Sequence, residues 1–496
     1  MQLLINLQNA IHKHKKRNAF LINGIFYPYS DFAETISKIR TSIQLNSSET
    51  EKNIGLVVND DLETYAAIIA LWFEGKAYVP ISPENPRHRN ENIIHQAFLR
   101  TIIDSSEKPL FPEYHLIETK KLPATLTNLT PKNVSEQDAV YILFTSGTTG
   151  QPKGVPITLS NLTGFIAAFE EMGFGIDEND RCLQMFDLTF DLSVMSYLVP
   201  LLRGACIYTI PKDKIKYSYI GELMDEQKLT VALMVPSILH YLRPYFSEIN
   251  FPDMKYSLFC GEALHLDITE EWSRCLPNAK IVNFYGPTED TIFCTQYTFD
   301  RTGRNKSHNG VLSIGKAMKG TVAIIIDENN QVLPFGNSGQ LCLGGTQLTT
   351  GYWNNGEKNK EVFFSTSYNG KKERFYKTGD LCRCDEDGDI LYLGRIDFQI
   401  KVQGFRVELY EIEFHVKNFL ERTNVVAVAF ADAIGNTEIG LVIESKEFDT
   451  TSLHDYMKTV MPTYMIPKRI TFIEGFALNT NGKIDRKALE LLLKSS

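Results

Sequence analysis

The chain has 496 residues, of which 43% are hydrophobic and 22% charged, and its net charge is −9, from 51 basic and 60 acidic residues. One hydrophobic core rarely serves a chain of this length, so we expect a globular protein of two or more domains. The acidic balance disfavours nucleic-acid binding, and no apolar run approaches the roughly eighteen residues of a membrane span, so we expect no membrane insertion.

The first twenty residues predict an amphipathic helix that ends in a basic run. This segment lacks the long apolar stretch and the cleavage site of a secretory signal, so we expect a cytoplasmic protein. The eight cysteines are scattered without C-x-x-C pairs or histidine spacing, which indicates neither a disulfide framework nor a zinc site. Cys382 and Cys384 fit an ordinary strand with both thiols on one face.

Residues 53–104 follow a βαβ rhythm. The strand-like run 53–58 precedes an apolar helical pattern over 64–80, and a further helix leads into the run 98–104. The rhythm resumes with the near-continuous apolar run 139–144, a loop rich in glycine and threonine, and a helix over 161–174. Such runs are typical of buried parallel strands, so the sequence predicts a parallel sheet.

Two later strands, 256–261 and 280–286, each end in glycine, which places polar groups at the edge where open α/β sheets bind ligands. From 310 to 392, short strands separated by turns predict a β-rich subdomain. A helix over 407–420 and alternating strands and helices then predict a small α+β unit, with a boundary near 395–398. The predicted fold class is α/β, with a large N-terminal domain of mixed, largely parallel sheets plus the β-rich subdomain, and a small α+β C-terminal domain.

The loop 145–154, with the sequence Thr-Ser-Gly-Thr-Thr-Gly-Gln-Pro-Lys-Gly, predicts a phosphate-binding site. Its glycines let backbone N–H groups approach an anion, its hydroxyls donate hydrogen bonds, and Lys153 supplies a positive charge. It is not a Walker A loop, because Lys153 follows Gly150 by three residues and is itself followed by glycine. The mechanics of P-loop GTPases and kinases are therefore not implied.

This loop belongs to an ordered series of strings that resembles the adenylate-forming superfamily of acyl-CoA synthetases, amino-acid adenylation domains and luciferases. The others are GKAYVPISPENP (75–86), FDLS (190–193), NFYGPTE (283–289), GQLCLGG (339–345), YKTGDL (376–381), GRIDFQIKVQGFRVELYEIE (394–413) and NGKIDR (481–486). The resemblance runs nearly end to end. It implies an N-terminal adenylation core over 1–395 and a mobile C-terminal domain over 396–496, with a hinge at Asp397.

The resemblance further implies that ATP and Mg²⁺ bind at the motif positions. Tyr285 is expected to stack on adenine, with Asn283 at the adenine edge, since an aromatic face offers a purine a large contact area. Asp380 is expected to accept from the ribose hydroxyls and Glu289 to bind Mg²⁺, which takes one or two carboxylates plus phosphate oxygens. The full predicted nucleotide set is Thr145, Ser146, Gly147, Thr148, Thr149, Lys153, Gly261, Glu262, Asn283, Phe284, Tyr285, Gly286, Thr288, Asp380 and Arg395.

Lys483 matches the family's catalytic lysine, which bridges the substrate carboxylate and the α-phosphate. A mobile ammonium suits this role, because it stabilises charge that is greatest in the transition state. The implied reaction has two halves. A carboxylate and ATP first give acyl-AMP and pyrophosphate; the small domain then rotates, and a thiol attacks the mixed anhydride.

The string FDLS resembles the amino-acid-activating branch, in which the aspartate, here Asp191, pairs with the substrate's α-ammonium group. Acyl- and aryl-CoA ligases have no cation to neutralise there. The other implied pocket residues are apolar, which indicates a small uncharged side chain. They are Leu192, Met195, Leu258, Cys260, Phe284, Ile292 and Phe293, with Leu233 or Met234 at a further position, and Lys483 reaches the substrate carboxylate.

More narrowly, FDLSVM and LFCGE resemble the D-alanine:carrier-protein ligases of teichoic-acid alanylation. Phe284 and residues 290–293 depart from that pattern, which has smaller residues at these positions. Another small apolar amino acid, such as proline or an alanine enantiomer, is therefore an alternative substrate.

No thiolation domain follows Ser496, so we expect the acceptor to be the phosphopantetheine thiol of a separate carrier protein, and the chain to be a monomer. The alternative is an acyl- or aryl-CoA ligase that uses free coenzyme A. A non-catalytic nucleotide-binding scaffold is a third interpretation. It is disfavoured by four intact motif residues, Lys153, Glu289, Asp380 and Lys483.

Overall fold

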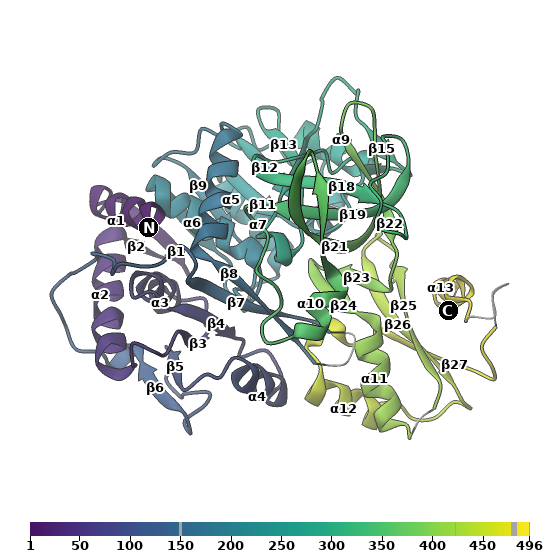
Figure 1. The fold of residues 1–496 in the computed structure, drawn as a ribbon, viewed down its shortest axis with the longest axis horizontal. Coiled ribbons are helices and arrows are strands. Elements are labelled where there is room, and N and C mark those ends of the chain that lie inside the picture. The colour runs from purple at the N-terminus through teal and green to yellow at the C-terminus, as the bar shows by residue number, and fades with distance from the viewer. Residues whose placement is uncertain (148–150, 422, 478–483, 496) are drawn as a thin grey trace. The chain divides into compact units, whose positions relative to one another are not determined.

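The computed structural model describes residues 1–147, 151–421, 423–477 and 484–495, and the chain forms two compact units (Figure 1). Unit 1 comprises Met1–Pro83, Gln96–Leu143 and Gly154–Ile396. Unit 2 comprises Glu84–His95, Phe144–Lys153 and Asp397–Ser496. Two short internal segments, one of which holds the predicted phosphate loop, thus group with the C-terminal residues. A hinge at Asp397 and a mobile domain over 396–496 stay predictions.

The largest sheet of unit 1 has nine strands. Its middle strands run parallel, as the βαβ rhythm predicts, and its outer strands pair antiparallel. Because the parallel strands share one direction, their carboxyl ends open at one edge, where ligands of such sheets bind. In spatial order the strands are β17 (Lys316–Ala317), β14 (Thr295–Thr298), β13 (Lys280–Tyr285), β12 (Tyr256–Phe259), β11 (Val231–Met234), β9 (Arg181–Gln184), β10 (Cys206–Thr209), β1 (Asn18–Ile22) and β2 (Ile25–Pro28).

A second sheet has six strands, and the predicted phosphate loop connects β7 to β8. The order is β6 (His115–Glu118), β5 (Thr101–Asp104), β3 (Asn53–Val57), β4 (Ala77–Ile81), β7 (Ala139–Thr145) and β8 (Lys153–Thr158). Strand β3 pairs parallel with both β4 and β5, and β4 pairs parallel with β7. A buried parallel strand that runs into a glycine-rich loop is thus confirmed.

The β-rich subdomain is confirmed as an antiparallel five-stranded sheet of unit 1. Cys382 and Cys384 both lie in its long strand β21, as predicted. Beside it lies a two-stranded pair, β15 (Ser307–His308) and β16 (Val311–Leu312). The strands of the five-stranded sheet are β18 (Thr321–Ile326), β19 (Ser338–Gly345), β21 (Lys371–Cys384), β20 (Phe363–Tyr368) and β22 (Ile390–Arg395).

The helices of unit 1 pack apolar faces into one large hydrophobic core. Helix α3 is buried on all sides apart from Glu63, and Asp61 caps it by accepting from the amide of Thr64 at 2.9 Å. Trp72 ties α3 to β7, since its indole N–H donates to the carbonyl of Val140 at 2.9 Å. The helices are α1 (Gln2–Lys13), α2 (Tyr29–Asn46), α3 (Leu62–Phe73), α5 (Leu159–Glu171), α6 (Asp191–Arg203), α7 (Lys216–Glu226), α8 (Ser237–Leu242), α9 (Leu266–Cys275) and α10 (Gly356–Val362).

The part of unit 2 that follows Asp397 mixes helices and strands, as the sequence predicts for these residues. The helix expected from 407 begins at Leu409 instead, because Val407 and Glu408 pair with Ile400 and Gln399 in a hairpin. Across the described residues of both units, no helix is long and apolar enough to cross a bilayer. The elements are α4 (Arg87–Gln96), β23 (Gln399–Val402), β24 (Phe405–Glu408), α11 (Leu409–Phe419), β25 (Val425–Ala431), β26 (Thr437–Glu444), α12 (Thr451–Val460), β27 (Arg469–Ile473) and α13 (Arg486–Ser495).

A buried ion pair joins α2 to the end of α3 in unit 1. The guanidinium of Arg40 lies 2.8 Å from a carboxylate oxygen of Glu74, and both side chains are almost fully buried. Arg40 also donates to the carbonyls of Asn128 and Thr130 at 2.9 and 2.8 Å. One side chain therefore holds a helix pair and a polar connecting segment together.

We predict that Arg40→Met lowers the free energy of unfolding by about 2–3 kcal/mol, because it removes a buried charge partner and its bonds to two carbonyls, while Lys132 at 2.9 Å still pairs with Glu74. The matched control is Arg203→Met, whose pair with Glu170 is 40% and 50% exposed and should cost about 1 kcal/mol or less. Urea unfolding followed by tryptophan fluorescence measures both. Equal losses in the two variants would contradict the prediction.

Candidate active site

Tyr285, Asp380 and Arg395 form one hydrogen-bonded cluster in unit 1. Tyr285 ends β13, and Asp380 on β21 lies directly opposite Arg395 on β22. The Tyr285 hydroxyl donates to one carboxylate oxygen of Asp380, and Arg395 donates to the other at 2.9 Å. Burial, and next the charge of Asp380, raises the pKa of the Tyr285 phenol, so the phenol stays a proton donor. The cluster thus fixes a carboxylate whose oxygens keep lone pairs for the hydroxyls of a ligand.

Asn283 precedes Tyr285 by two residues on β13, so both side chains lie on the same face of the sheet. The Asn283 side chain is buried, and its Nδ2 donates to the carbonyl of Ser313 at 3.0 Å, which fixes the orientation of the amide. Its Oδ1 then has no hydrogen-bond partner among the described residues. A buried acceptor without a donor is unfavourable, and the exocyclic amine of adenine is a donor that would satisfy it. This face of β13 therefore fits a purine.

The side chain of Phe284, between Asn283 and Tyr285 in the sequence, lies on the opposite face of β13. This face also carries predicted apolar pocket residues, which we call the apolar wall. The strand register places Leu258 and Leu233 on that face, whereas Met234 alternates to the other. The ring of Phe284 stacks on that of Phe293, with centroids 4.0 Å apart. Only the backbone of Phe284 therefore lies with the predicted nucleotide residues. All predicted apolar pocket residues are buried: Leu192, Met195, Leu233, Met234, Leu258, Cys260, Phe284, Ile292 and Phe293.

Asp191 is the first residue of α6 and is buried, with 6% of its surface exposed. A helix N-terminus favours a negative charge at this position. Burial and the charge of Asp191 both raise the pKa of the phenols of Tyr78 and Tyr141. The Tyr141 hydroxyl has no hydrogen-bond partner among the described residues. Asp191 thus lies near two buried phenols, which no sequence motif singled out, and this arrangement can receive a ligand cation.

Glu289 lies fully buried in the turn Thr288–Asp290 and accepts a hydrogen bond from the hydroxyl of Tyr352. Beside it, burial and next the charge of Glu289 raise the pKa of Asp290 to about 7. The described residues hold no group of three or more metal-binding side chains. A carboxylate such as that of Glu289 fits Mg²⁺, which takes one or two carboxylates and completes its shell with phosphate oxygens and water.

The turns that follow β12 and β13 hold predicted nucleotide residues. Glu262, directly after Gly261, accepts from the amide of Ser237 at 2.8 Å and so satisfies the first turn of α8. A Cβ at Gly286 would come within 2.4 Å of the Cα of Phe293, so only glycine allows this close approach. Both turns are therefore fixed by contacts to other parts of unit 1.

In unit 2 the predicted phosphate loop contacts two carboxylates. The amide of Gly147 donates to Glu411 at 3.1 Å, and Nζ of Lys153 lies 3.5 Å from a carboxylate oxygen of Glu408. The hydroxyl of Ser146 donates to a backbone carbonyl of β24 at 2.8 Å. The three donor types expected to bind phosphate, an amide, an ammonium and a hydroxyl, thus bind acceptors of the segment 405–411.

The remaining predicted residues divide between described and undescribed parts of the chain. The hydroxyl of Thr145 donates to the carbonyl of Lys153 at 3.5 Å, across the base of the loop. The carboxylate of Asp397, where unit 2 resumes, accepts from the amide of Gln399 at 3.1 Å. Thr148, Thr149 and Lys483 lie outside the described residues.

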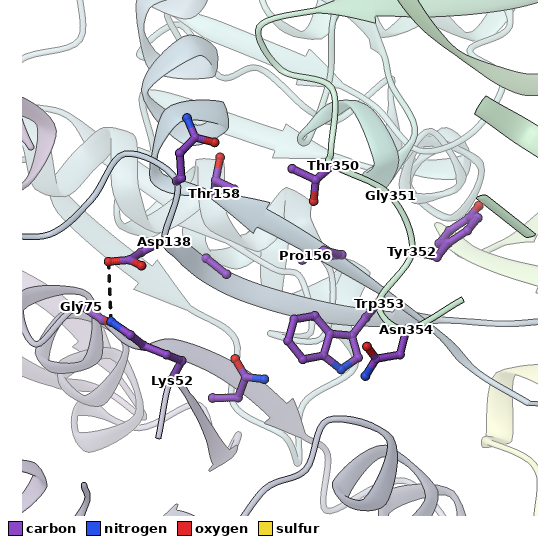
Figure 2. A pocket seen from close by; sticks show the side chains of 13 residues that line it. Lys52, Gly75, Asp138, Pro156, Thr158, Thr350, Gly351, Tyr352, Trp353 and Asn354 are labelled. Carbon is purple, nitrogen blue, oxygen red and sulfur yellow. Dashed lines mark hydrogen bonds and ion pairs between the residues drawn. The ribbon is translucent and has the colours of Figure 1, made fainter. Parts of the chain in front are cut away.

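A pocket of ≈ 320 Å³ in unit 1 is lined by none of the predicted site residues (Figure 2). Figure 2 shows Lys52 and Asp138, whose charged groups lie 3.8 Å apart, and Trp353, whose indole N–H donates to the carbonyl of Gln96 at 3.1 Å. The pocket lies at the amino ends of β3 and β7, whereas ligands of parallel sheets bind at the carboxyl ends. It is therefore not the candidate active site.

Comparison of the chain with known proteins identifies its family. Residues 7–353 match the family of AMP-binding enzymes. The chain is 30% identical over 502 residues to the D-alanine--D-alanyl carrier protein ligase of Lacticaseibacillus casei (strain BL23), with 96% of both chains covered. It is 28% identical to tyrocidine synthase 3 of Brevibacillus parabrevis over 97% of its own length, but spans only 7% of that protein. It spans 42% of tyrocidine synthase 1 of the same organism, at 29% identity.

Among solved structures, the fold is similar to that of the Vibrio cholerae adenylation domain AlmE, crystallised in complex with glycyl-adenosine-5'-phosphate. The TM-score is 0.88 at 25% sequence identity, with 100% of this chain and 98% of that chain covered. With a family match over most of its length and a relative of almost equal extent, the chain belongs to the AMP-binding enzyme family, and it is an adenylate-forming ligase that uses ATP.

Proposed function

We propose that the enzyme activates a small, uncharged amino acid as its aminoacyl-AMP and passes the aminoacyl group to the phosphopantetheine thiol of a carrier protein. The buried carboxylate of Asp191 carries this proposal. An α-ammonium group beside this carboxylate gains a charge-assisted hydrogen bond, which a fatty or aryl acid cannot form. The negative charge at the start of α6 therefore favours amino acids over other carboxylic acids.

The size of the substrate follows from the apolar wall. The stacked rings of Phe284 and Phe293 and the buried Leu258 give this face large apolar side chains, which favours a substrate with a small side chain. The names of two similar proteins support this choice, since one is a D-alanine--D-alanyl carrier protein ligase and the other was crystallised with a glycyl adenylate. We infer that the substrate is glycine, either enantiomer of alanine, or proline.

In the first half-reaction an oxygen of the amino-acid carboxylate attacks the α-phosphorus of ATP, and the bond from that phosphorus to the bridging oxygen breaks. Asn283 and Tyr285 hold the adenine, and Asp380 accepts from the ribose hydroxyls. Glu289 would hold a Mg²⁺ ion, which neutralises phosphate charge when bound. Lys483 donates to the carboxylate and the α-phosphate as charge builds between them, and pyrophosphate leaves.

In the second half-reaction the sulfur of the phosphopantetheine thiol attacks the carbonyl carbon of the adenylate. The bond from that carbon to the phosphate oxygen breaks, AMP leaves, and the thiol proton passes to solvent. Movement about Asp397 withdraws Lys483 between the two steps, because the lysine serves only the first. The thioester product then stays on the carrier protein.

A panel of amino acids tests the proposal directly. We expect amino-acid-dependent exchange of pyrophosphate into ATP with glycine, L- or D-alanine, or proline, and none above background with charged or large aromatic amino acids. Fatty and aryl acids, each offered with and without coenzyme A, complete the panel. A fatty or aryl acid as the best substrate would overturn the amino-acid assignment and establish a coenzyme A ligase instead.

We predict that Asp191→Asn lowers kcat/KM for the preferred amino acid by roughly 10²-fold or more, because the variant keeps the shape of the side chain and removes the charge that pairs with the substrate ammonium. ATP affinity, measured by calorimetry, should stay within twofold. Exchange that remains within fivefold of the wild-type rate would show that Asp191 does not bind the ammonium group.

The contacts of the phosphate loop generate a prediction about phosphate binding. Glu408 lies beside Lys153, so an incoming phosphate must replace its carboxylate. We predict that Glu408→Gln binds inorganic pyrophosphate and ATP at least roughly fivefold more tightly, because the variant removes the carboxylate that competes for the largely buried Lys153. Calorimetric titration with each anion measures the effect.

The matched control is Glu413→Gln, which removes the same charge from α11, where Glu413 pairs with Arg486. Glu413 has no contact with the loop residues described, so pyrophosphate affinity should not change. Equal gains in affinity in the two variants would indicate a general charge effect and not competition at Lys153.

A further inference from the structure

The segment 289–293 in unit 1 has an unusual backbone. Thr291 and Ile292 have φ values of +52° and +74°, in the left-handed region that favours glycine. Both residues are β-branched and buried, and β-branched side chains are sterically disfavoured there. A backbone of this kind persists only where the surrounding structure holds it.

One side chain holds this segment. The carboxamide nitrogen of Gln347 donates to the backbone carbonyls of Asp290, Thr291 and Phe293 at 3.2, 3.1 and 2.9 Å. In return, the hydroxyl of Thr291 donates to the backbone carbonyl of Gln347. Gln347 is fully buried, and three carbonyl acceptors around one nitrogen fix the orientation of its amide. Gln347 thus forms hydrogen bonds with both ends of the strained turn.

The segment 290–293, to which Gln347 forms hydrogen bonds, contains predicted pocket residues. Ile292 and Phe293 belong to the predicted apolar wall, and Phe293 stacks on Phe284 at 4.0 Å. On its other side, the Cα of Phe293 lies against Gly286, where no side chain would fit. Without the hydrogen bonds of Gln347, we expect the strained turn to relax away from Phe284 and Gly286. This movement would enlarge the pocket.

We propose that Gln347 is a positioning residue that sets substrate size: by holding the strained backbone of 290–293, it fixes Ile292 and Phe293 as the wall of the acyl-substrate pocket. The inference rests on the proposed function for the kind of substrate, an amino acid. It does not rest on the nucleotide site, because the three carbonyls belong to residues that follow Glu289. Loss of these hydrogen bonds should therefore change the preference for the size of the acyl substrate and leave the affinity for ATP unchanged.

The test compares Gln347→Met with the wild type. Methionine keeps the length of the side chain and removes the donors. We expect KM for the preferred amino acid to rise at least tenfold, KM for ATP to stay within twofold, and the ratio of kcat/KM for the next larger homologue over the preferred substrate to rise roughly tenfold. The ratio is the decisive readout, because simple loss of folded enzyme lowers both numbers equally.

Thr349→Val is the matched control. Thr349 lies in the same segment, is equally buried, and donates through its hydroxyl to the carbonyl of Pro156, outside the strained turn. It should leave the substrate ratio unchanged. If Gln347→Met does not fold, Gln347→Asn keeps an amide but shortens its reach, and the same rise in the ratio is expected.

Two outcomes are distinguishable. If the wild type prefers a fatty or aryl acid, the proposed function fails, and the ratio is then measured with homologues of that acid. If the ratio stays unchanged in a folded Gln347 variant, or if Thr349→Val shifts it as much, the positioning role is overturned whatever the substrate.

Discussion

The alternation of side chains along β13 is the constraint on which the candidate site depends. Consecutive residues of a strand point to opposite faces of the sheet, so Asn283 and Tyr285 lie on one face and Phe284 on the other. The polar face carries the Tyr285 ring and an amide oxygen that has no partner among the described residues, and the strand register places Leu258 on the apolar face. In the proposed function, a single strand therefore contacts the nucleotide on one face and the amino acid on the other.

The loop that follows β13 gains its shape from a different part of the chain. Glu289 and the strained residues Thr291 and Ile292 are held by the segment 346–352, through the carboxamide of Gln347 and the hydroxyl of Tyr352. Strain of this kind is stable because several buried hydrogen bonds act on a few consecutive residues. The β-rich subdomain therefore carries Asp380, the carboxylate proposed to bind ribose, and its neighbouring segment supports the turn after β13.

The phosphate loop in unit 2 combines opposite charges at short range. Its lysine and a backbone amide contact Glu408 and Glu411, and Glu411 also pairs with Arg89 on α4 at 2.7 Å. Donors that bind phosphate can bind a carboxylate equally well, because both anions present acceptor oxygens to the same N–H groups. If the loop binds ATP phosphates as proposed, these phosphates must replace protein carboxylates that now occupy its donors.

The sequence by itself determined the fold class, the β-rich subdomain, the family and the motif positions, because apolar periodicity, glycine placement and ordered strings are local properties of the chain. Only the tertiary structure decided that Phe284, Leu258 and Leu233 share one face of the sheet, with Met234 on the other, and that Gln347 hydrogen-bonds to a turn more than fifty residues earlier. Strand register and long-range hydrogen bonds depend on which distant segments become neighbours, and no local pattern encodes that pairing.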